Sequence, residues 1–154
     1  MTEARELVAV LTRRGETVAA AESLTAGLVC ATLAQVPGAS AVLRGGLVVY
    51  ATELKAALAG VDEQLLAEHG AVHPEVAAQL ARGARERCGA TWGLGLTGVA
   101  GPDPQDGVAP GTVYVGLSGP GADTVRELAE TGDRDIIRTS SVRAAFALLR
   151  EQLD

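Results

Sequence analysis

Aromatic residues, lysine and cysteine are all scarce in this chain of 154 residues. Aromatics make up only 3% of the sequence, so its core has to be built from small aliphatic side chains, a composition that suits helices packed on a sheet. The two cysteines, Cys30 and Cys88, lack a C-x-x-C spacing. We therefore interpret both as small buried hydrophobic residues.

Positive charge is also in short supply, because 13 basic residues face 19 acidic ones and the net charge is -6. This balance argues against a broad surface that follows a phosphate backbone, so nucleic acid is not an expected partner. No stretch approaches the roughly 18 apolar residues that a membrane helix needs, and the N-terminus is acidic and amphipathic, unlike a signal peptide. We expect a cytoplasmic protein with no membrane partner.

The remaining composition, with 47% apolar residues, is enough for one compact domain over residues 1–154. Periodicity and turn residues predict alternating helices and strands. The expected helices cover 3–14, 25–36, 52–59, 62–69, 74–89 and a last segment capped by Asp133, and the expected strands cover 17–23, 47–50, 91–98, 112–118 and 124–130. This order predicts an α/β fold with a helix-covered mixed sheet, in which a crossover joins the early strands and hairpins join the later ones.

One short stretch, 38–55, offers a hydroxyl, a phenol and an amine in Ser40, Tyr50 and Lys55. If 46–50 is a strand and Gly45-Gly46 reverses the chain, Ser40 reaches back to Tyr50, and one helical turn brings Lys55 to the same place. A buried lysine can take the proton of a serine nucleophile, and the phenol can share it. Taken singly, each residue also has an ordinary explanation as a helix cap, a strand end or a solvated lysine.

The turn 22–27 follows a buried strand and precedes a helix, which leaves backbone N–H groups at Thr25, Ala26 and Gly27 to face a phosphate or an oxyanion. Glu22 begins this turn and is a further candidate for substrate binding. The alternative is simple capping of the helix by Thr25.

Two later segments offer more candidate binding residues. The loop that begins with Thr97, Gly98 and Gly101 has the composition of a rigid turn that lets a ligand approach the backbone closely. Arg134 and Arg138 lie one turn apart on the last helix, where they can bind a phosphate. An ordinary tight turn and solvated arginines are the alternatives. No pattern indicates a metal site, and we expect no cofactor.

Seven motifs follow one another in an order that resembles the CinA C-terminal domain family: E-S-L-T-A-G (22–27), P-G-A-S (37–40), G-G-x-V-x-Y-x-x-x-x-K (45–55), H-G-A-V (69–72), T-G-V-A-G-P-D (97–103), G-T-V-Y (111–114) and G-D-R-D-x-x-R (132–138). The likeness is to the stand-alone nicotinamide-nucleotide amidohydrolase form. It implies a three-layer α/β/α fold with about five strands, and a dimer or larger homo-oligomer.

The resemblance further implies hydrolysis of the carboxamide of nicotinamide mononucleotide, a small-molecule nucleotide, to nicotinate mononucleotide and ammonia. It assigns the catalytic roles to Ser40, Tyr50 and Lys55. Two alternatives stay open: a nucleotide-binding or regulatory module with little turnover, and an interaction domain in DNA uptake or damage response, which the negative charge disfavours.

Overall fold

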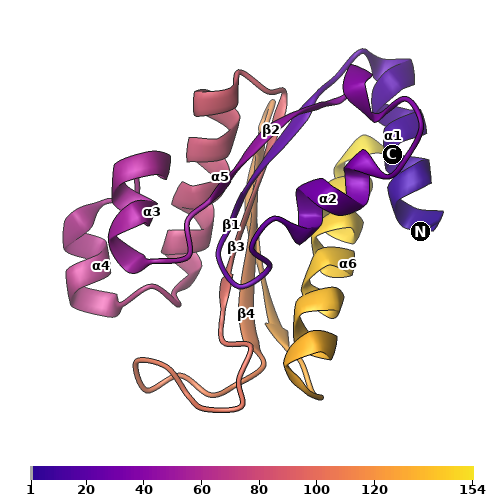
Figure 1. The fold of residues 1–154 in the computed structure, drawn as a ribbon. Helices are drawn as coiled ribbons and strands as arrows, with labels where there is room; N and C mark the ends of the chain where they lie inside the picture. The colour runs from indigo at the N-terminus through magenta and orange to yellow at the C-terminus, as the bar shows by residue number, and fades with distance from the viewer. Residues whose placement is uncertain (1) are drawn as a thin grey trace.

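A computed structural model describes residues 2–154 as a five-stranded mixed sheet covered by helices on both faces (Figure 1). In chain order the elements are α1 (Thr2–Arg14), β1 (Val18–Glu22), α2 (Leu28–Ala34), a short 3₁₀ helix (Ala39–Ala41), β2 (Leu43–Val48), α3 (Thr52–Ala59), α4 (Glu63–His69), α5 (Pro74–Cys88), β3 (Trp92–Gly98), β4 (Thr112–Gly119), β5 (Ala122–Ala129) and α6 (Arg134–Leu153). No helix within this described part of the chain has both the length and the apolar character needed to cross a bilayer.

The strands lie in the order β2-β1-β3-β4-β5, so the first strand is in the interior and the second forms an edge. β1 runs parallel to both β2 and β3, while β3, β4 and β5 form an antiparallel meander. The carboxyl ends of β1, β2 and β3 therefore meet at the same edge of the sheet, here called the carboxyl edge. In open α/β sheets this is the edge at which ligands bind.

Two separate cores fill the space between the sheet and its helices. α1, α2 and α6 cover one face, where they bury leucines and valines together with Trp92 and Phe146. α5 crosses the other face and carries α3 and α4 on its outer side. This arrangement confirms the predicted three-layer α/β/α fold.

Close packing of α5 on the sheet depends on glycines in the central strands. A Cβ at Gly116 would lie 2.3 Å from the carbonyl oxygen of Ala77, and one at Gly95 would lie 2.4 Å from the amide nitrogen of Ala81. Both neighbours are backbone atoms of α5, so they have no side-chain freedom with which to move away. Glycine at these two positions therefore lets the backbone of α5 lie directly against the central strands.

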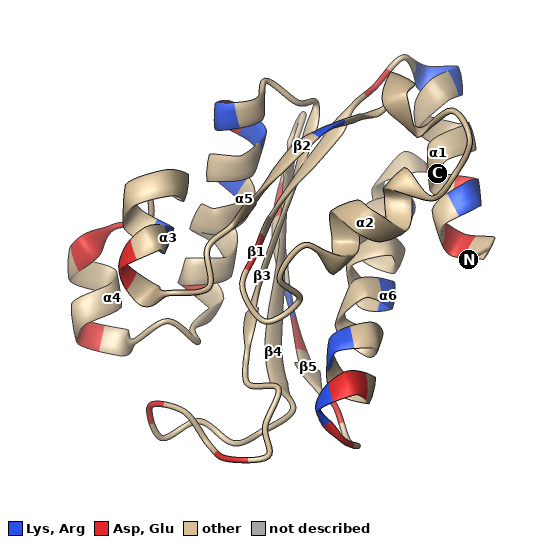
Figure 2. Ribbon diagram, viewed as in Figure 1, with Lys and Arg blue, Asp and Glu red and all other residues tan. Residues whose placement is uncertain are grey.

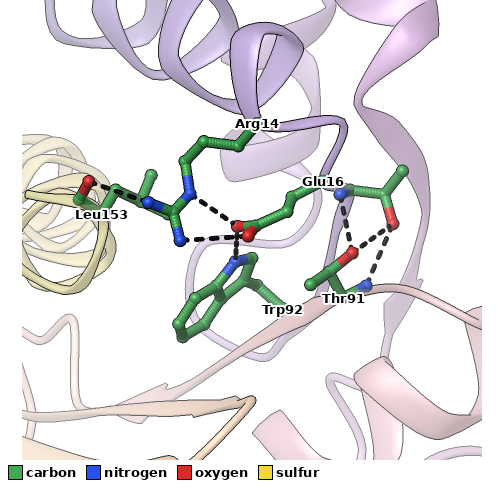
Figure 3. Close-up of polar contacts among 6 residues, drawn as sticks. Arg14, Glu16, Thr91, Trp92 and Leu153 are labelled. Atoms are coloured by element: carbon green, nitrogen blue, oxygen red, sulfur yellow. Dashed lines mark hydrogen bonds and ion pairs between the residues drawn. The ribbon is translucent and has the colours of Figure 1, made fainter.

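At the amino end of the sheet, a polar cluster ties three elements together (Figure 3). The carboxylate of Glu16 accepts hydrogen bonds from the indole of Trp92 at 2.7 Å and from Arg14 at 3.0 Å. Arg14 in turn donates to the carbonyl of Leu153 at the end of α6. The cluster fixes the end of α1 against β3 and the last helix, far from the carboxyl edge.

The structure corrects two of the predicted boundaries. The second strand begins at Leu43, so Gly45 and Gly46 lie inside it and do not reverse the chain. Gly46 instead makes room for α2, because a Cβ at this position would lie 2.4 Å from the sulfur of Cys30 on that helix. The second helix begins at Leu28, later than predicted.

Candidate active site

A cavity of about 390 Å³ opens at the carboxyl edge. Its wall is assembled from the ends of β1, β2 and β3, from the segment between α4 and α5, from the loop that joins β3 to β4, and from the first residue of α6. The residues that line it are Ser23, Leu24, Tyr50, Ala71, Val72, Thr97, Gly98, Val99, Ala100, Gly101, Pro102, Asp103, Pro104, Gln105 and Arg134. Segments that are far apart in the sequence therefore share one pocket.

The amine of Lys55 lies buried beside this cavity, with only 1% of the residue exposed. Its Nζ is 2.9 Å from the hydroxyl of Ser23, 2.8 Å from the carbonyl oxygen of Val49 and 3.2 Å from that of Tyr50. A neutral amine has two N–H bonds and one lone pair. Two carbonyls can take both N–H bonds, which leaves the lone pair free to accept the proton of Ser23.

Burial lowers the pKa of Lys55 from its ordinary 10.5 to about 8, because the charged ammonium is poorly solvated in the interior. The carboxylate of Glu53 acts in the opposite direction and is the smaller influence. A lysine with a pKa near 8 is a competent general base close to neutral pH.

Ser23 stands directly after β1 at the carboxyl edge. Its amide donates to the carbonyl of Leu96, which extends the pairing of β1 with β3 by one residue. The chain then turns sharply, since the amide of Ala26 donates back to the carbonyl of Ser23 and Ala26 adopts a positive φ of 49°. A serine at the end of a strand and at the start of a tight turn has its hydroxyl presented to the cavity, as a nucleophile requires.

The prediction that Ser40 meets Lys55 and Tyr50 is wrong. Ser40 lies in the 3₁₀ helix that precedes β2, and its side chain is exposed. β2 then runs from Leu43 to Val48 in register with β1, and a strand of this length covers roughly 17–20 Å. Ser40 therefore lies at the opposite end of the sheet from the cavity, because Gly45 and Gly46 carry the strand straight on.

Tyr50 reaches the site in a different way from the one predicted. Its backbone carbonyl holds Lys55, but its phenol points away and is hydrogen-bonded to Arg134 at 2.8 Å. The same guanidinium donates to the carbonyl of Gly101 at 2.6 Å. Arg134 thus joins the end of β2, the β3–β4 loop and the start of α6 across the mouth of the cavity.

The predicted binding residues divide into two groups. Thr97, Gly98, Gly101 and Arg134 all line the cavity. The back wall is closed by Thr97, whose hydroxyl donates to the carbonyl of Ala71 at 2.7 Å.

The second group supports the turn after β1 and does not line the cavity. Glu22 is buried, and its carboxylate accepts the amides of Val29 and Cys30 at 2.9 and 3.2 Å, so it caps α2 from within. The first amides of α2 are therefore occupied and do not face an anion.

Thr25, Ala26 and Gly27 lie in the turn itself, outside the cavity lining. Arg138 also braces this turn, since it donates to the carbonyls of Leu24 and Thr25 at 2.8 and 3.1 Å. The amide of Ala26 and the guanidinium of Arg138 therefore hold the turn that follows Ser23 through hydrogen bonds to backbone carbonyls.

The sequence pattern does not single out Ser23, because it falls at the end of the predicted strand 17–23 and Thr25, two residues later, indicates the start of a helix. A signal for it was present, since a polar residue directly after a buried strand is expected at the carboxyl edge. Within residues 2–154 no group of three or more His, Cys, Asp or Glu side chains is placed to hold a metal ion.

The matching family model and the curated relatives indicate the same protein family. The family described as CinA C-terminal domain matches residues 2–153. A CinA-like protein of Frankia casuarinae is 50% identical over 147 residues, which are 96% of this chain and 34% of that protein. A CinA-like protein of Anaeromyxobacter sp. is 51% identical over 145 residues, which are 94% of this chain and 35% of that protein. The chain spans about a third of the length of these curated relatives.

Solved structures agree closely with the fold. The competence/damage inducible protein CihA from Agrobacterium tumefaciens is 31% identical, with a TM-score of 0.94 over 97% of this chain and 93% of that one. A CinA superfamily protein from Klebsiella pneumoniae is 29% identical, with a TM-score of 0.95 over 99% of this chain and 96% of that one.

Proposed function

Starting from the fact that the chain belongs to the CinA C-terminal domain family, we propose that it hydrolyses the carboxamide of nicotinamide mononucleotide to nicotinate mononucleotide and ammonia. The observation that carries this proposal is the contact of 2.9 Å between the buried amine of Lys55 and the hydroxyl of Ser23 beside a cavity. A serine with an amine base is suited to attack on an amide carbonyl.

In the first half of the reaction, the Ser23 oxygen attacks the carboxamide carbon while Lys55 takes the hydroxyl proton. Lys55 then gives that proton to the departing nitrogen, so ammonia leaves and a nicotinoyl ester remains on Ser23. In the second half, water attacks the ester carbon and passes its proton to Lys55. The proton returns to Ser23 as the carbon–oxygen bond breaks, which restores both groups.

The oxyanion of these steps needs a hydrogen-bond donor near Ser23. The next residue, Leu24, lines the cavity, and its amide donates to no other group within residues 2–154. One such donor is worth about 3–4 kcal/mol of barrier in enzymes where it has been removed. Arg138 stabilises the same turn through the Leu24 carbonyl, so we assign it a positioning role in place of the substrate contact predicted from sequence.

The phosphate of the substrate is assigned to Arg134, the arginine that lines the cavity. Two of its five N–H groups are used by Tyr50 and Gly101, which fix the guanidinium plane and leave the others for an anion. Tyr50 therefore serves to orient Arg134. Thr97 and Gly98, which line the same wall, complete the contact surface for the rest of the nucleotide.

Turnover is tested by incubating the purified protein with nicotinamide mononucleotide and measuring ammonia and nicotinate mononucleotide. Wild-type protein should release both in equal amounts, and Lys55→Met should release neither while keeping the far-ultraviolet circular dichroism of the wild type. Wild-type protein that binds the nucleotide without releasing ammonia would favour a binding or regulatory module instead.

The role of Arg134 is tested by comparing the mononucleotide with the corresponding riboside, which lacks the phosphate. Arg134→Ala should raise KM for the mononucleotide by roughly tenfold or more, as expected for a lost charged hydrogen bond, and should change KM for the riboside little. Equal effects on both substrates would contradict a phosphate contact. Tyr50→Phe is the matched variant that loosens Arg134 without removing its charge.

A further inference from the structure

The cavity at the carboxyl edge contains a charged side chain besides Arg134. Among the residues that line it, Arg134 and Asp103 alone carry charge, and both are exposed. Figure 2 shows that the acidic positions of the loop between β3 and β4 lie at the same end of the molecule as the basic positions at the start of α6. No ion pair or side-chain hydrogen bond within residues 2–154 involves the carboxylate of Asp103, so it is free to bind a ligand.

The β3–β4 loop holds Asp103 near Arg134, although the two do not form an ion pair. The guanidinium of Arg134 donates to the carbonyl of Gly101 at 2.6 Å, and Asp103 follows two residues later. Two residues of chain span at most about 7 Å. Beyond Asp103, the backbones of Gln105 and Val108 exchange hydrogen bonds of 3.0 and 2.8 Å, which close the loop. Asp103 is therefore in a loop tied on both sides, at a short distance from the arginine.

An arginine and an unpaired carboxylate this close together match the two halves of a sugar phosphate. The phosphate is an anion suited to the guanidinium, whereas the hydroxyls of the attached ribose are donors suited to a carboxylate. Acidic side chains bind ribose hydroxyls in this way at dinucleotide-binding sites. A carboxylate placed directly on the phosphate would repel it, so the ligand group beside Asp103 has to be a hydrogen-bond donor.

We propose that the carboxylate of Asp103 accepts hydrogen bonds from the ribose hydroxyls of the nucleotide whose phosphate binds Arg134. The role of Asp103 depends on the proposed function, which assigns the carboxamide to Ser23 and the phosphate to Arg134, with the ribose between them. Asp103 thereby selects ligands that carry the sugar hydroxyls. It determines specificity and takes no part in the breaking or forming of bonds.

A second aspartate in the same loop offers a matched control. Asp106 is also exposed, but it does not line this cavity. It lies against Gly70 instead, where a Cβ would be 3.0 Å from Oδ2 of Asp106. Asp103→Asn and Asp106→Asn each remove one negative charge from the loop, and only the first removes it from the cavity.

The test measures binding by isothermal titration calorimetry in Ser23→Ala protein, which should not consume the ligand. The ligands are nicotinamide mononucleotide and its analogues with fluorine in place of the 2′- or the 3′-hydroxyl, because fluorine keeps the size of the group and has no proton to donate. With Asp103 present, at least one analogue should bind about tenfold more weakly than the nucleotide, as expected for a lost hydrogen bond to a charged group.

Variants of the loop show whether Asp103 is the acceptor. Adding Asp103→Ala should weaken binding of the nucleotide about tenfold and cause no further loss for that analogue, because both changes remove the same hydrogen bond. Asp103→Asn should weaken the preference for the hydroxyl, and Asp106→Asn should leave it unchanged. Equal affinity for all three ligands, or full losses that multiply in the alanine variant, would overturn the proposal.

Ammonia release by protein with Ser23 intact reports the proposed hydrolysis separately. Release of ammonia by a protein that binds the three ligands equally well would remove the role of Asp103 and leave the hydrolysis standing. Discrimination among the ligands without any release would do the reverse, since a site that recognises ribose through Asp103 would then be present without the reaction.

Discussion

The pH dependence of the proposed hydrolysis should be set by the amine of Lys55. Burial lowers the pKa of this amine from 10.5 to about 8, and the residue is 1% exposed. A lowering of this size corresponds to about 3 kcal/mol in favour of the neutral form, so the neutral fraction at pH 7 is about 300-fold larger than for a solvated lysine. Since only the neutral amine accepts the proton of Ser23, kcat/KM should fall about tenfold for each pH unit below 8 and level off above it.

The lowered pKa of Lys55 also makes the free energy of unfolding depend on pH. The folded pKa of about 8 lies below the unfolded value, so between these two values the unfolded chain binds more protons than the folded one. The destabilisation by Lys55 is therefore fully present below pH 8 and disappears as the pH rises through the unfolded pKa. Lys55→Met should remove this rise in stability at alkaline pH, relative to the wild type.

Initial rates of ammonia release from about pH 6 to pH 9.5 provide the assay. The expected profile has one inflection near pH 8 in kcat/KM. Lys55→Arg keeps a cation and its donors but cannot become neutral, so it should be inactive throughout this range. A flat profile, or an arginine variant with substantial activity, would refute the assignment of Lys55 as the base.

Three further results are expected. Gly116→Ala should lower the free energy of unfolding by about 3 kcal/mol, since its Cβ would lie 2.3 Å from the Ala77 carbonyl. Gly45→Ala should lower it by about 1 kcal/mol or less, because its Cβ would have only an ordinary contact at 3.8 Å. Denaturant melts of the two variants measure the difference. Hydrogen bonding lowers the pKa of Glu16, so the stability it contributes is lost as the pH falls through that lowered value, and thermal melts of Glu16→Gln should be less sensitive to acid. Glu22→Ala should lower both thermal stability and kcat, because two amides of α2 lose their acceptor and the turn carrying the nucleophile loosens.

Much of the fold follows from short-range patterns in the sequence. The apolar stripe of 3–14, the Asp133 cap and the Pro74 start each predict a helix that the structure contains. These signals are local, so tertiary packing does not override them. The order of strands follows as well, because crossovers after early strands and hairpins after late ones leave few topologies open.

The candidate site was less predictable, because its assembly depends on whether the chain reverses or continues straight at Gly45 and Gly46. Gly45 and Gly46 are equally compatible with a reversal and with a strand whose neighbours press closely on it. The sequence alone does not show that Cys30 of α2 requires the space above Gly46. A reversal at these glycines would bring Ser40 to Lys55. The continuous strand instead leaves Ser40 at the other end of the sheet, and the amine of Lys55 contacts Ser23.

The identity of the nucleophile is the central claim, and it is tested by measuring ammonia release from nicotinamide mononucleotide by Ser23→Ala and Ser40→Ala under identical conditions. The account predicts loss of kcat by several orders of magnitude in Ser23→Ala and a rate close to that of the wild type in Ser40→Ala. The reverse order, or equal activity of the two variants, would contradict it.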